Sequence, residues 1–291
     1  MTVAAAPHFL LGTSWKMTKT LAEAEAYVEE LAEVEVPAGL QLFVLPAHTA
    51  LARVRDRLSP GSGIVLGAQN AHWAEEGAFT GEVSMRMARD AGAELVEIGH
   101  SERRNLFGET DETVAAKVEA ALAHGLTPLV CVGEPLASRD RGEAAAFVAA
   151  QVRAALARVP DDADALVVVA YEPVWSIGVG GTPAGPTDVT PVVAAVREVV
   201  GREHPSLTLA VLYGGSVDEH NAAELVEQVD LDGLFVGRAA WEAAGLARLS
   251  AICAVAVRHA DATGVTPEQP SGSARVAYID RPDERTDREE L

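Results

Sequence analysis

The chain has 291 residues, 48% of them hydrophobic, and a formal net charge of −20 at pH 7. This length suits one large α/β domain or two small ones, and the charge argues against nucleic acid or an acidic membrane surface as a partner. It contains no run of about 18 or more apolar residues, so no membrane-spanning helix is expected.

Eight apolar, strand-like runs recur along the chain. They cover residues 9–12, 41–45, 64–67, 95–99, 128–133, 166–170, 209–213 and 233–236. Between them lie stretches with helical periodicity, which include residues 21–32, 113–123, 144–157 and 191–200. Continuous apolar strands are typical of a parallel sheet that is buried on both faces. Eight strand–helix units over roughly 250 residues predict a single α/β domain, a (β/α)8 barrel.

An open, doubly wound sheet is the alternative fold. Its support would be a dinucleotide-binding motif in the glycine-rich segment 178–181, but Pro183 and Pro186 interrupt this segment and no Gly-x-x-Gly half opens a helix there. We therefore favour the barrel and assign it to residues 1–260. The following residues, 261–291, are rich in Pro, Gly, Ser, Asp, Glu and Arg and are expected to form a polar, partly disordered extension.

The cysteines and the N-terminus indicate a cytoplasmic protein. Cys131 and Cys253 lie in apolar stretches without metal or redox spacing, as expected for buried thiols in a reducing compartment. The first seven residues lack the basic start of a secretory signal and lead directly into a strand.

Polar clusters follow four of the predicted strands. They are Trp15-Lys16-Met17, Gly99-His100-Ser101-Glu102-Arg103-Arg104, Tyr171-Glu172-Pro173-Val174-Trp175 and Tyr213-Gly214-Gly215-Ser216. The carboxyl ends of barrel strands meet at one face, so these clusters are expected to form one active site. Glu172 would be a catalytic base, because it ends a buried strand and precedes a proline and a glycine-rich, lid-like loop. By itself, the segment would equally suit a strand-end glutamate before an ordinary turn.

From residue 9 to about residue 260 the sequence resembles the triosephosphate isomerase family. The match rests on the four clusters above and on Gly67-Ala68-Gln69-Asn70, Gly77-Ala78-Phe79-Thr80-Gly81-Glu82 and Phe107-Gly108-Glu109, all in the family's order. The resemblance implies a TIM barrel and an isomerase of small sugar phosphates that uses no cofactor and no metal. This family is itself the standard example of a glutamate base and a neutral histidine beneath a closing loop.

The resemblance also assigns roles to individual residues. Glu172 falls on the position of the base, His100 on that of the group that polarises the carbonyl, and Lys16 on that of the active-site lysine. Backbone donors would hold the phosphate of the substrate. The positions that would supply them are Gly178, Gly214, Gly215, Ser216 and Gly237.

Further residues are implied to support the site. Glu102, with Glu82 and Arg103, would form an ion-pair network beside Ser101. The loop at residues 72–82 resembles one that docks into a neighbouring subunit. Thr80 would then lie near the partner's site, so the resemblance implies a homodimer.

Four positions depart from the family pattern. Ser14 replaces an asparagine, Gly181 replaces a lysine of the lid, and Arg238 replaces the second glycine after the eighth strand. Pro183 stands where the lid supplies a backbone N–H, which proline lacks, so the latch between the closed lid and the Tyr213 hydroxyl must be altered. Arg238 either clamps the phosphate or points to solvent.

Two substrate pairs are compatible with this pattern. The default is glyceraldehyde 3-phosphate and dihydroxyacetone phosphate, the reaction of glycolysis and gluconeogenesis. The alternative is L-erythrulose 1-phosphate and D-erythrulose 4-phosphate in tetritol catabolism, because a branch of the family that acts on these has a similar Gly-Thr-Ser-Trp-Lys-Met start and Gly-Arg-Ala-Ala-Trp segment. The short Ser14 would make room for the extra hydroxymethyl group. A non-catalytic sugar-phosphate-binding protein is a distant alternative, against which the presence of all three catalytic residue types argues.

Overall fold

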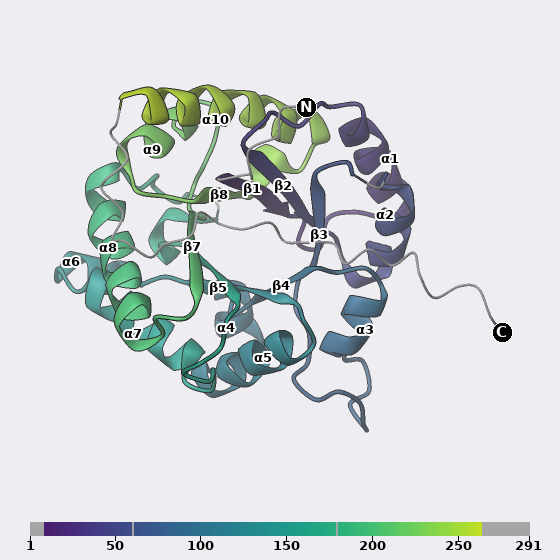
Figure 1. Cartoon of the computed structure of the whole chain (residues 1–291), viewed down its shortest axis with the longest axis horizontal. Helices are drawn as coiled ribbons and strands as arrows, with labels where there is room; N and C mark the ends of the chain where they lie inside the picture. Colours follow the sequence, from purple (N-terminus) through teal and green to yellow (C-terminus); the bar gives the residue numbers. More distant parts are fainter. Residues whose placement is uncertain (1–8, 60, 179, 264–291) are drawn as a thin grey trace.

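Eight parallel strands close into a barrel in chain order, from β1 to β8, in the computed structural model, which describes residues 9–59, 61–178 and 180–263 (Figure 1). The strands are β1 (Phe9–Ser14), β2 (Leu40–Leu45), β3 (Ile64–Ala68), β4 (Leu95–Ile98), β5 (Thr127–Val132), β6 (Leu166–Tyr171), β7 (Thr208–Tyr213) and β8 (Gly233–Val236). Pairing of β8 with β1 closes the sheet. The predicted TIM barrel is thereby confirmed, and the open sheet is excluded.

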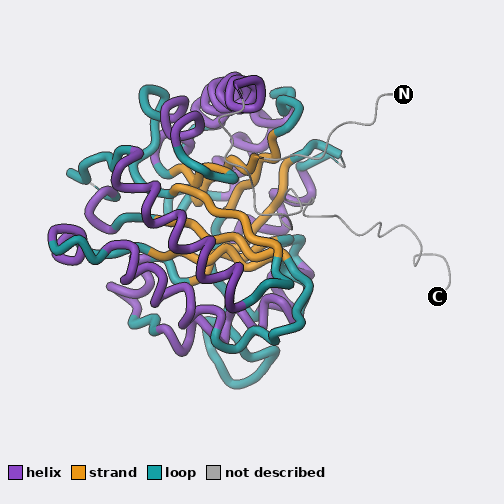
Figure 2. The backbone as a smooth tube through the Cα atoms, turned by 60° about the vertical axis from the view of Figure 1, so that its left-hand side comes forward, coloured by secondary structure: helices purple, strands orange, loops and turns teal. Residues whose placement is uncertain are grey.

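Helices surround the barrel, as Figure 2 shows with the strands in orange inside the purple helices. The helices are α1 (Leu21–Ala32), α2 (Leu51–Arg57), α3 (Met85–Asp90), α4 (Ser101–Phe107), α5 (Asp111–Ala123), α6 (Leu136–Asp140), α7 (Ala144–Leu156), α8 (Pro186–Glu203), α9 (Ala222–Gln228) and α10 (Ala243–Thr263). Short 3₁₀ turns are η1 (His48–Ala50), η2 (Val174–Ser176) and η3 (Arg238–Ala240).

Local sequence explains where several helices begin. Thr20 caps α1 and forms a reciprocal capping box with Glu23. Helix α8 begins at Pro186, five residues before the predicted start, because proline at the first helical position gives up an N–H that would have no partner there. The prolines that interrupt the glycine-rich segment therefore mark the passage from the loop after β6 into α8.

The alternation of side chains along the strands separates two apolar layers. Inward-facing residues such as Leu95, Leu129 and Phe235 fill the barrel, whereas outward-facing ones such as Val96 and Ile98 pack beneath the helices. On β4 this alternation turns Glu97 inward, between Val96 and Ile98. The barrel interior is thus mostly apolar, with polar residues such as Glu97 on β4 and the buried Gln41 at the amino end of β2 among its inward-facing side chains.

The predicted domain limit at residue 260 falls within α10, which ends at Thr263. The rest of the predicted polar extension, residues 264–291, lies outside the described residues. Among the described helices, none is both long enough and apolar enough to cross a membrane.

Candidate active site

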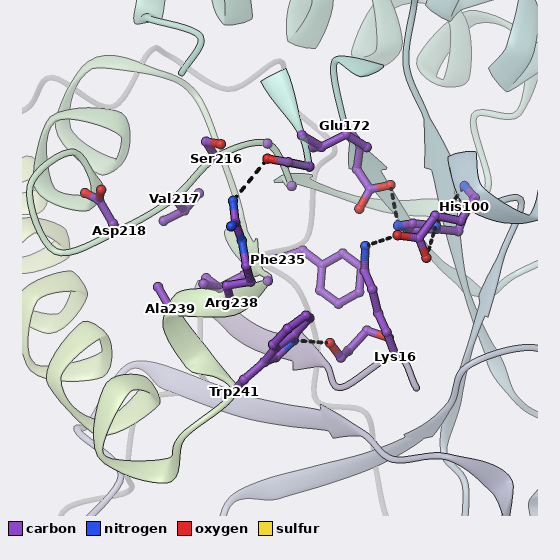
Figure 3. Close-up of a pocket in the computed structure, with 18 residues that line it drawn as sticks. Lys16, His100, Glu172, Ser216, Val217, Asp218, Phe235, Arg238, Ala239 and Trp241 are labelled. Atoms are coloured by element: carbon purple, nitrogen blue, oxygen red, sulfur yellow. Dashed lines mark hydrogen bonds and ion pairs between the residues drawn. The ribbon is translucent and has the colours of Figure 1, made fainter. Parts of the chain in front are cut away.

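A cavity of about 560 Å³ opens at the carboxyl ends of the strands (Figure 3). Its walls come from the ends of β1, β4, β6, β7 and β8, so residues far apart in sequence meet there. The residues named in the sequence analysis that line it are Ser14, Lys16, His100, Glu102, Glu172, Gly178, Gly214, Gly215, Ser216, Gly237 and Arg238. Thr80 is exposed on the loop before α3, and Tyr213 is fully buried.

Glu172 directly follows β6 and is buried at the floor of this cavity. Its Oε2 lies 3.5 Å from Nε2 of His100. Burial, and next to it the negative charge of Glu97, raises the pKa of Glu172 to about 8. Because its pKa is raised, the Glu172 carboxylate is a stronger base than an exposed one, which suits proton abstraction from carbon.

His100 caps the N-terminus of α4, and its Nδ1 accepts a hydrogen bond from the Glu102 backbone N–H at 3.1 Å. Since Nδ1 accepts, the proton of the neutral ring is on Nε2, the atom that faces Glu172. Burial, and then the nearby Lys16 ammonium, lowers the pKa of His100 to about 4. The structure therefore presents a neutral imidazole with an N–H donor toward the cavity.

Lys16 adopts a left-handed backbone with φ of 53°, the only positive φ among the described non-glycine residues. This conformation costs ~1–3 kcal/mol, and the Gln69 side chain supports it by donating to the Lys16 carbonyl at 3.0 Å. The ammonium contacts Glu102 Oε1 at 2.7 Å. Burial opposes the charge, but the contacts with Glu102 outweigh it, and the pKa of Lys16 lies above its ordinary value. Lys16 therefore remains a cation beside His100.

Close packing requires glycine at both positions after β7, because neighbouring side chains occupy the place of a Cβ there. A Cβ on Gly214 would lie 2.8 Å from Glu172 Cγ, and one on Gly215 would overlap the Tyr213 hydroxyl. By contrast, a Cβ on Gly178 or Gly237 would meet no atom within 4 Å. The backbone at these two positions faces open space, where an anion could approach it.

The loop that follows Glu172, described at residues 174–178 and 180–184, is called the lid here, and contacts with Glu134, Ser216 and Arg238 help to hold it. The Ser216 hydroxyl donates to the Ser176 carbonyl at 2.7 Å, and Arg238 Nη2 donates to the Gly178 carbonyl at 3.0 Å. Arg238 is exposed but reaches the lid, so it does not simply point to solvent. A Cβ on Gly181 would lie within 2.4 Å of the Ser176 carbonyl oxygen, so a lysine cannot occupy this position in this conformation.

The supporting ion pairs differ in part from the expected network. Glu102 pairs with Lys16, but Arg103 pairs with Glu109 at 3.0 Å, and Lys117 contacts the other Glu109 oxygen at 2.8 Å. Glu82 instead lines an adjoining cavity of about 350 Å³. Ser101 is the first residue of α4, directly behind His100.

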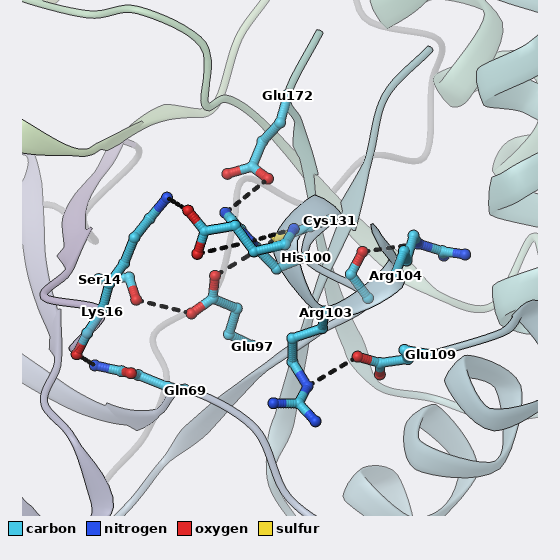
Figure 4. A network of polar contacts seen from close by, with 12 residues as sticks. Ser14, Lys16, Gln69, Glu97, His100, Arg103, Arg104, Glu109, Cys131 and Glu172 are labelled. Atoms are coloured by element: carbon cyan, nitrogen blue, oxygen red, sulfur yellow. Dashed lines mark hydrogen bonds and ion pairs between the residues drawn. The ribbon is translucent and has the colours of Figure 1, made fainter. Parts of the chain in front are cut away.

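Sequence reasoning missed Glu97, which lies at the centre of the polar network in Figure 4. This residue is 3% exposed, and burial raises its pKa to about 7. Its Oε2 accepts a hydrogen bond from the Ser14 hydroxyl at 2.9 Å. A signal was present in the sequence, since Glu97 is the only charged residue within the eight strands.

The barrel and this cavity define an intramolecular isomerase of the aldose–ketose type. The sequence model of the triosephosphate isomerase family matches residues 9–253, and the chain belongs to that family.

Three relatives are each named L-erythrulose-1-phosphate isomerase. The protein from Mycolicibacterium smegmatis is 49% identical over 82% of this chain and 90% of the relative. The one from Rhizobium rhizogenes is 46% identical over 87% of this chain and 98% of the relative. The one from Mesorhizobium japonicum is 51% identical over 81% of this chain and 94% of the relative. These names overturn our default expectation of the triose phosphate reaction of glycolysis and gluconeogenesis, which was therefore wrong.

Proposed function

We propose that this chain interconverts L-erythrulose 1-phosphate and D-erythrulose 4-phosphate, in tetritol catabolism. The similarity to relatives named for the first compound supports this substrate. The observation in the structure that carries the proposal is the position of Ser14. Its short side chain lines the cavity beside Lys16 and His100 and donates a hydrogen bond to Glu97, and a side chain of this size suits a substrate with one more carbon than a triose phosphate.

The reaction moves one proton between adjacent carbons. In L-erythrulose 1-phosphate the carbonyl is on C2 and the proton to be removed is on C3. Glu172 takes this proton, and the electrons of the C–H bond form an enediolate across C2 and C3. Return of the proton to C2, together with transfer of the C3 hydroxyl proton to the oxygen on C2, leaves the carbonyl on C3 and a hydroxyl on C2. The product, numbered from its other end, is D-erythrulose 4-phosphate, and no atom is gained or lost.

His100 and Lys16 stabilise the charge that develops on oxygen. The neutral His100 donates from Nε2 to the carbonyl oxygen, and the Lys16 ammonium balances the negative enediolate. Both groups are held by Glu102, through its backbone N–H and its carboxylate respectively. Donors that are fixed before the reaction need no rearrangement while the charge forms.

The phosphate lies at the other side of the cavity in this proposal. Backbone N–H groups of Gly215, Ser216 and Gly237 would face it, with Gly178 of the lid above. Gly214 lines the cavity, but its N–H donates to the Tyr171 carbonyl at 2.8 Å and is not free for the phosphate. Glycine allows a close approach of the backbone, and loops after strands seven and eight hold phosphate in many barrels. Arg238 adds a positive charge at this end.

We also infer a cytoplasmic homodimer. Large apolar side chains are exposed next to the smaller cavity, with Met17 98% and Phe107 69% exposed, and Phe79 and Thr80 are exposed on the loop before α3. A surface of this kind suits a partner subunit. The free, buried thiols of Cys131 and Cys253 suit a reducing compartment. Sedimentation at micromolar concentration tests the dimer.

The test of function is kcat/KM on L-erythrulose 1-phosphate and on dihydroxyacetone phosphate, measured side by side on the purified protein. We expect a tetrulose phosphate value at least tenfold higher, since one carbon in a pocket is typically worth ~1–3 kcal/mol. Binding of the tetrulose phosphate without turnover, or preference for the triose phosphate, would contradict the proposal.

A further inference from the structure

Glu97 is a buried carboxyl that the reaction described above does not use. It lies on β4, where the inward-facing neighbours on the adjoining strands are apolar, and it forms no ion pair among the described residues. An apolar side chain would fill this place without the cost of burying a carboxylate. The fold itself therefore provides no reason for a glutamate here.

The hydrogen bonds of Glu97 leave one oxygen poorly satisfied. Its Oε2 accepts from Ser14, at the end of β1. Within the described part of the chain, the only donor at Oε1 is the Cys131 thiol on β5, at 3.9 Å, and a thiol is a weak donor. Because β1 and β5 lie on opposite sides of the barrel, the carboxyl lies between them, below His100 in the view of Figure 4.

Glu97 also marks one end of the active site. The glycines after β7 and β8 line the larger cavity, Glu97 lines the smaller one, and Ser14, Lys16, His100 and Glu102 line both. A substrate with its phosphate at the glycines and its reacting carbons at His100 therefore points its unphosphorylated end toward Glu97. In a ketotetrose phosphate that end carries an additional hydroxymethyl group, attached to the second of the two reacting carbons.

The geometry points to a hydroxymethyl subsite formed by Ser14 and Glu97, in which the Glu97 carboxylate accepts a hydrogen bond from the terminal hydroxyl of the substrate. The subsite rests on the proposed function, because a triose phosphate has no carbon, and so no hydroxyl, beyond its two reacting carbons at that end. The Ser14 hydroxyl keeps one oxygen occupied, and the other is available to the substrate. Glu97 thereby becomes a specificity-determining residue, and its burial strengthens the discrimination, since a buried acceptor without a partner is costly.

Two substitutions separate this role from others. Glu97→Leu keeps a similar volume and removes the acceptor, whereas Glu97→Gln keeps an oxygen but removes the charge. We expect Glu97→Leu to lower kcat/KM on L-erythrulose 1-phosphate by about 10- to 100-fold, and to change that on dihydroxyacetone phosphate much less. Glu97→Gln should give an intermediate ratio. If turnover of dihydroxyacetone phosphate is too slow to measure, its inhibition constant is used in place of its kcat/KM. This constant is measured for inhibition of L-erythrulose 1-phosphate turnover.

The decisive readout is the ratio of kcat/KM on L-erythrulose 1-phosphate to kcat/KM on dihydroxyacetone phosphate, which we call the substrate ratio. Glu97 also influences the pKa of Glu172, but Glu172 acts on both substrates, so that influence cancels in the ratio. An equal loss on both substrates, or no change on either, would overturn the subsite. If Glu97→Leu does not fold, as judged by circular dichroism, a ratio for Glu97→Gln equal to that of the unaltered protein overturns it.

A control is Asp232→Asn, which alters another, partly buried carboxylate just before β8, at the opposite end of the barrel. It should leave the substrate ratio unchanged. Failure of the proposed function is distinguishable, because the unaltered protein would then show no turnover of L-erythrulose 1-phosphate, and the subsite would be rejected with it. The subsite alone is rejected if the unaltered protein turns over L-erythrulose 1-phosphate but the Glu97 variants keep its ratio of kcat/KM for the two substrates.

Discussion

Arg238 joins the loop after β8 to the lid, through a hydrogen bond of 3.0 Å from its Nη2 to the Gly178 carbonyl oxygen. The two residues are 60 positions apart in sequence, and both line the larger cavity. The lid thus has a cationic tether to the loop after β8, separate from the latch to the Tyr213 hydroxyl that the sequence predicted to be altered because of Pro183.

Replacement of Arg238 by alanine should weaken binding of both substrates. The guanidinium is exposed, so we expect KM for either substrate, and the inhibition constant of inorganic phosphate, to rise by only about 3- to 10-fold. Arg248→Ala, which removes an exposed arginine on α10 that pairs with Glu219, is the control and should change neither constant. A change in the substrate ratio instead would place Arg238 against the sugar rather than the phosphate.

Glu172→Gln should abolish proton transfer while it leaves binding intact. The amide has nearly the same shape but cannot accept the proton, and general base catalysis is typically worth ~10²–10⁴ in rate. We expect kcat to fall by that factor, and the inhibition constant of inorganic phosphate to remain within about threefold. Exchange of the substrate C3 proton with deuterated solvent should be lost in parallel. Residual turnover near that of the unaltered protein would show that another group is the base.

The pH dependence of kcat/KM should report the ionisation of Glu172. The base must be ionised, and its pKa is raised to about 8, so activity should fall as the pH decreases through about 8. His100, with its pKa lowered to about 4, should add no inflection above that value. Glu97→Gln should move the inflection to lower pH, because the Glu97 charge is the second cause of the shift. An inflection near the ordinary pKa of histidine that persists in Glu97→Gln, where the Glu97 ionisation is absent, would contradict the neutral imidazole.

The buried carboxyls should also make the unliganded protein less stable at alkaline pH. A carboxyl whose pKa is raised on folding binds more protons in the folded state, so the stability that it contributes is lost as the pH rises through the folded value. Glu172→Gln removes this ionisation. Its melting temperature should exceed that of the unaltered protein by more at pH 8.5 than at pH 5.5, as measured by calorimetry. An equal difference at both values would mean that Glu172 is not desolvated.

Gly181→Ala should disturb the lid and spare the barrel. The added Cβ would collide with the Ser176 carbonyl, which also accepts from Ser216, so the described lid conformation must shift. We expect kcat/KM to fall by tenfold or more and the melting temperature to change by only a degree or two, because the lid lies outside the barrel core. Gly201→Ala in α8, where a Cβ meets no atom within 4 Å, is the control and should leave kcat/KM unchanged. Full activity of Gly181→Ala would show that the lid tolerates a side chain there.

The sequence alone determined the barrel, because each of its signals is local. An apolar run between helical periods predicts a buried parallel strand wherever it occurs, and the predicted strands agree with β1 to β8 to within two residues at either end. The polar clusters that contain Lys16, His100, Glu172 and Gly214 could be placed at one face for the same reason, because each directly follows a predicted strand. The family, too, was recognisable from these clusters.

Only the tertiary structure decided which side chains meet and how strongly burial changes them. Ser14 and Glu97 lie 83 residues apart, and no local pattern predicts their hydrogen bond. The pKa shifts of Glu172, His100 and Glu97 come first from burial, which depends on every strand that encloses them. Sequence spacing carries no information about solvent exclusion, since that is a property of the closed barrel rather than of any one of its strands.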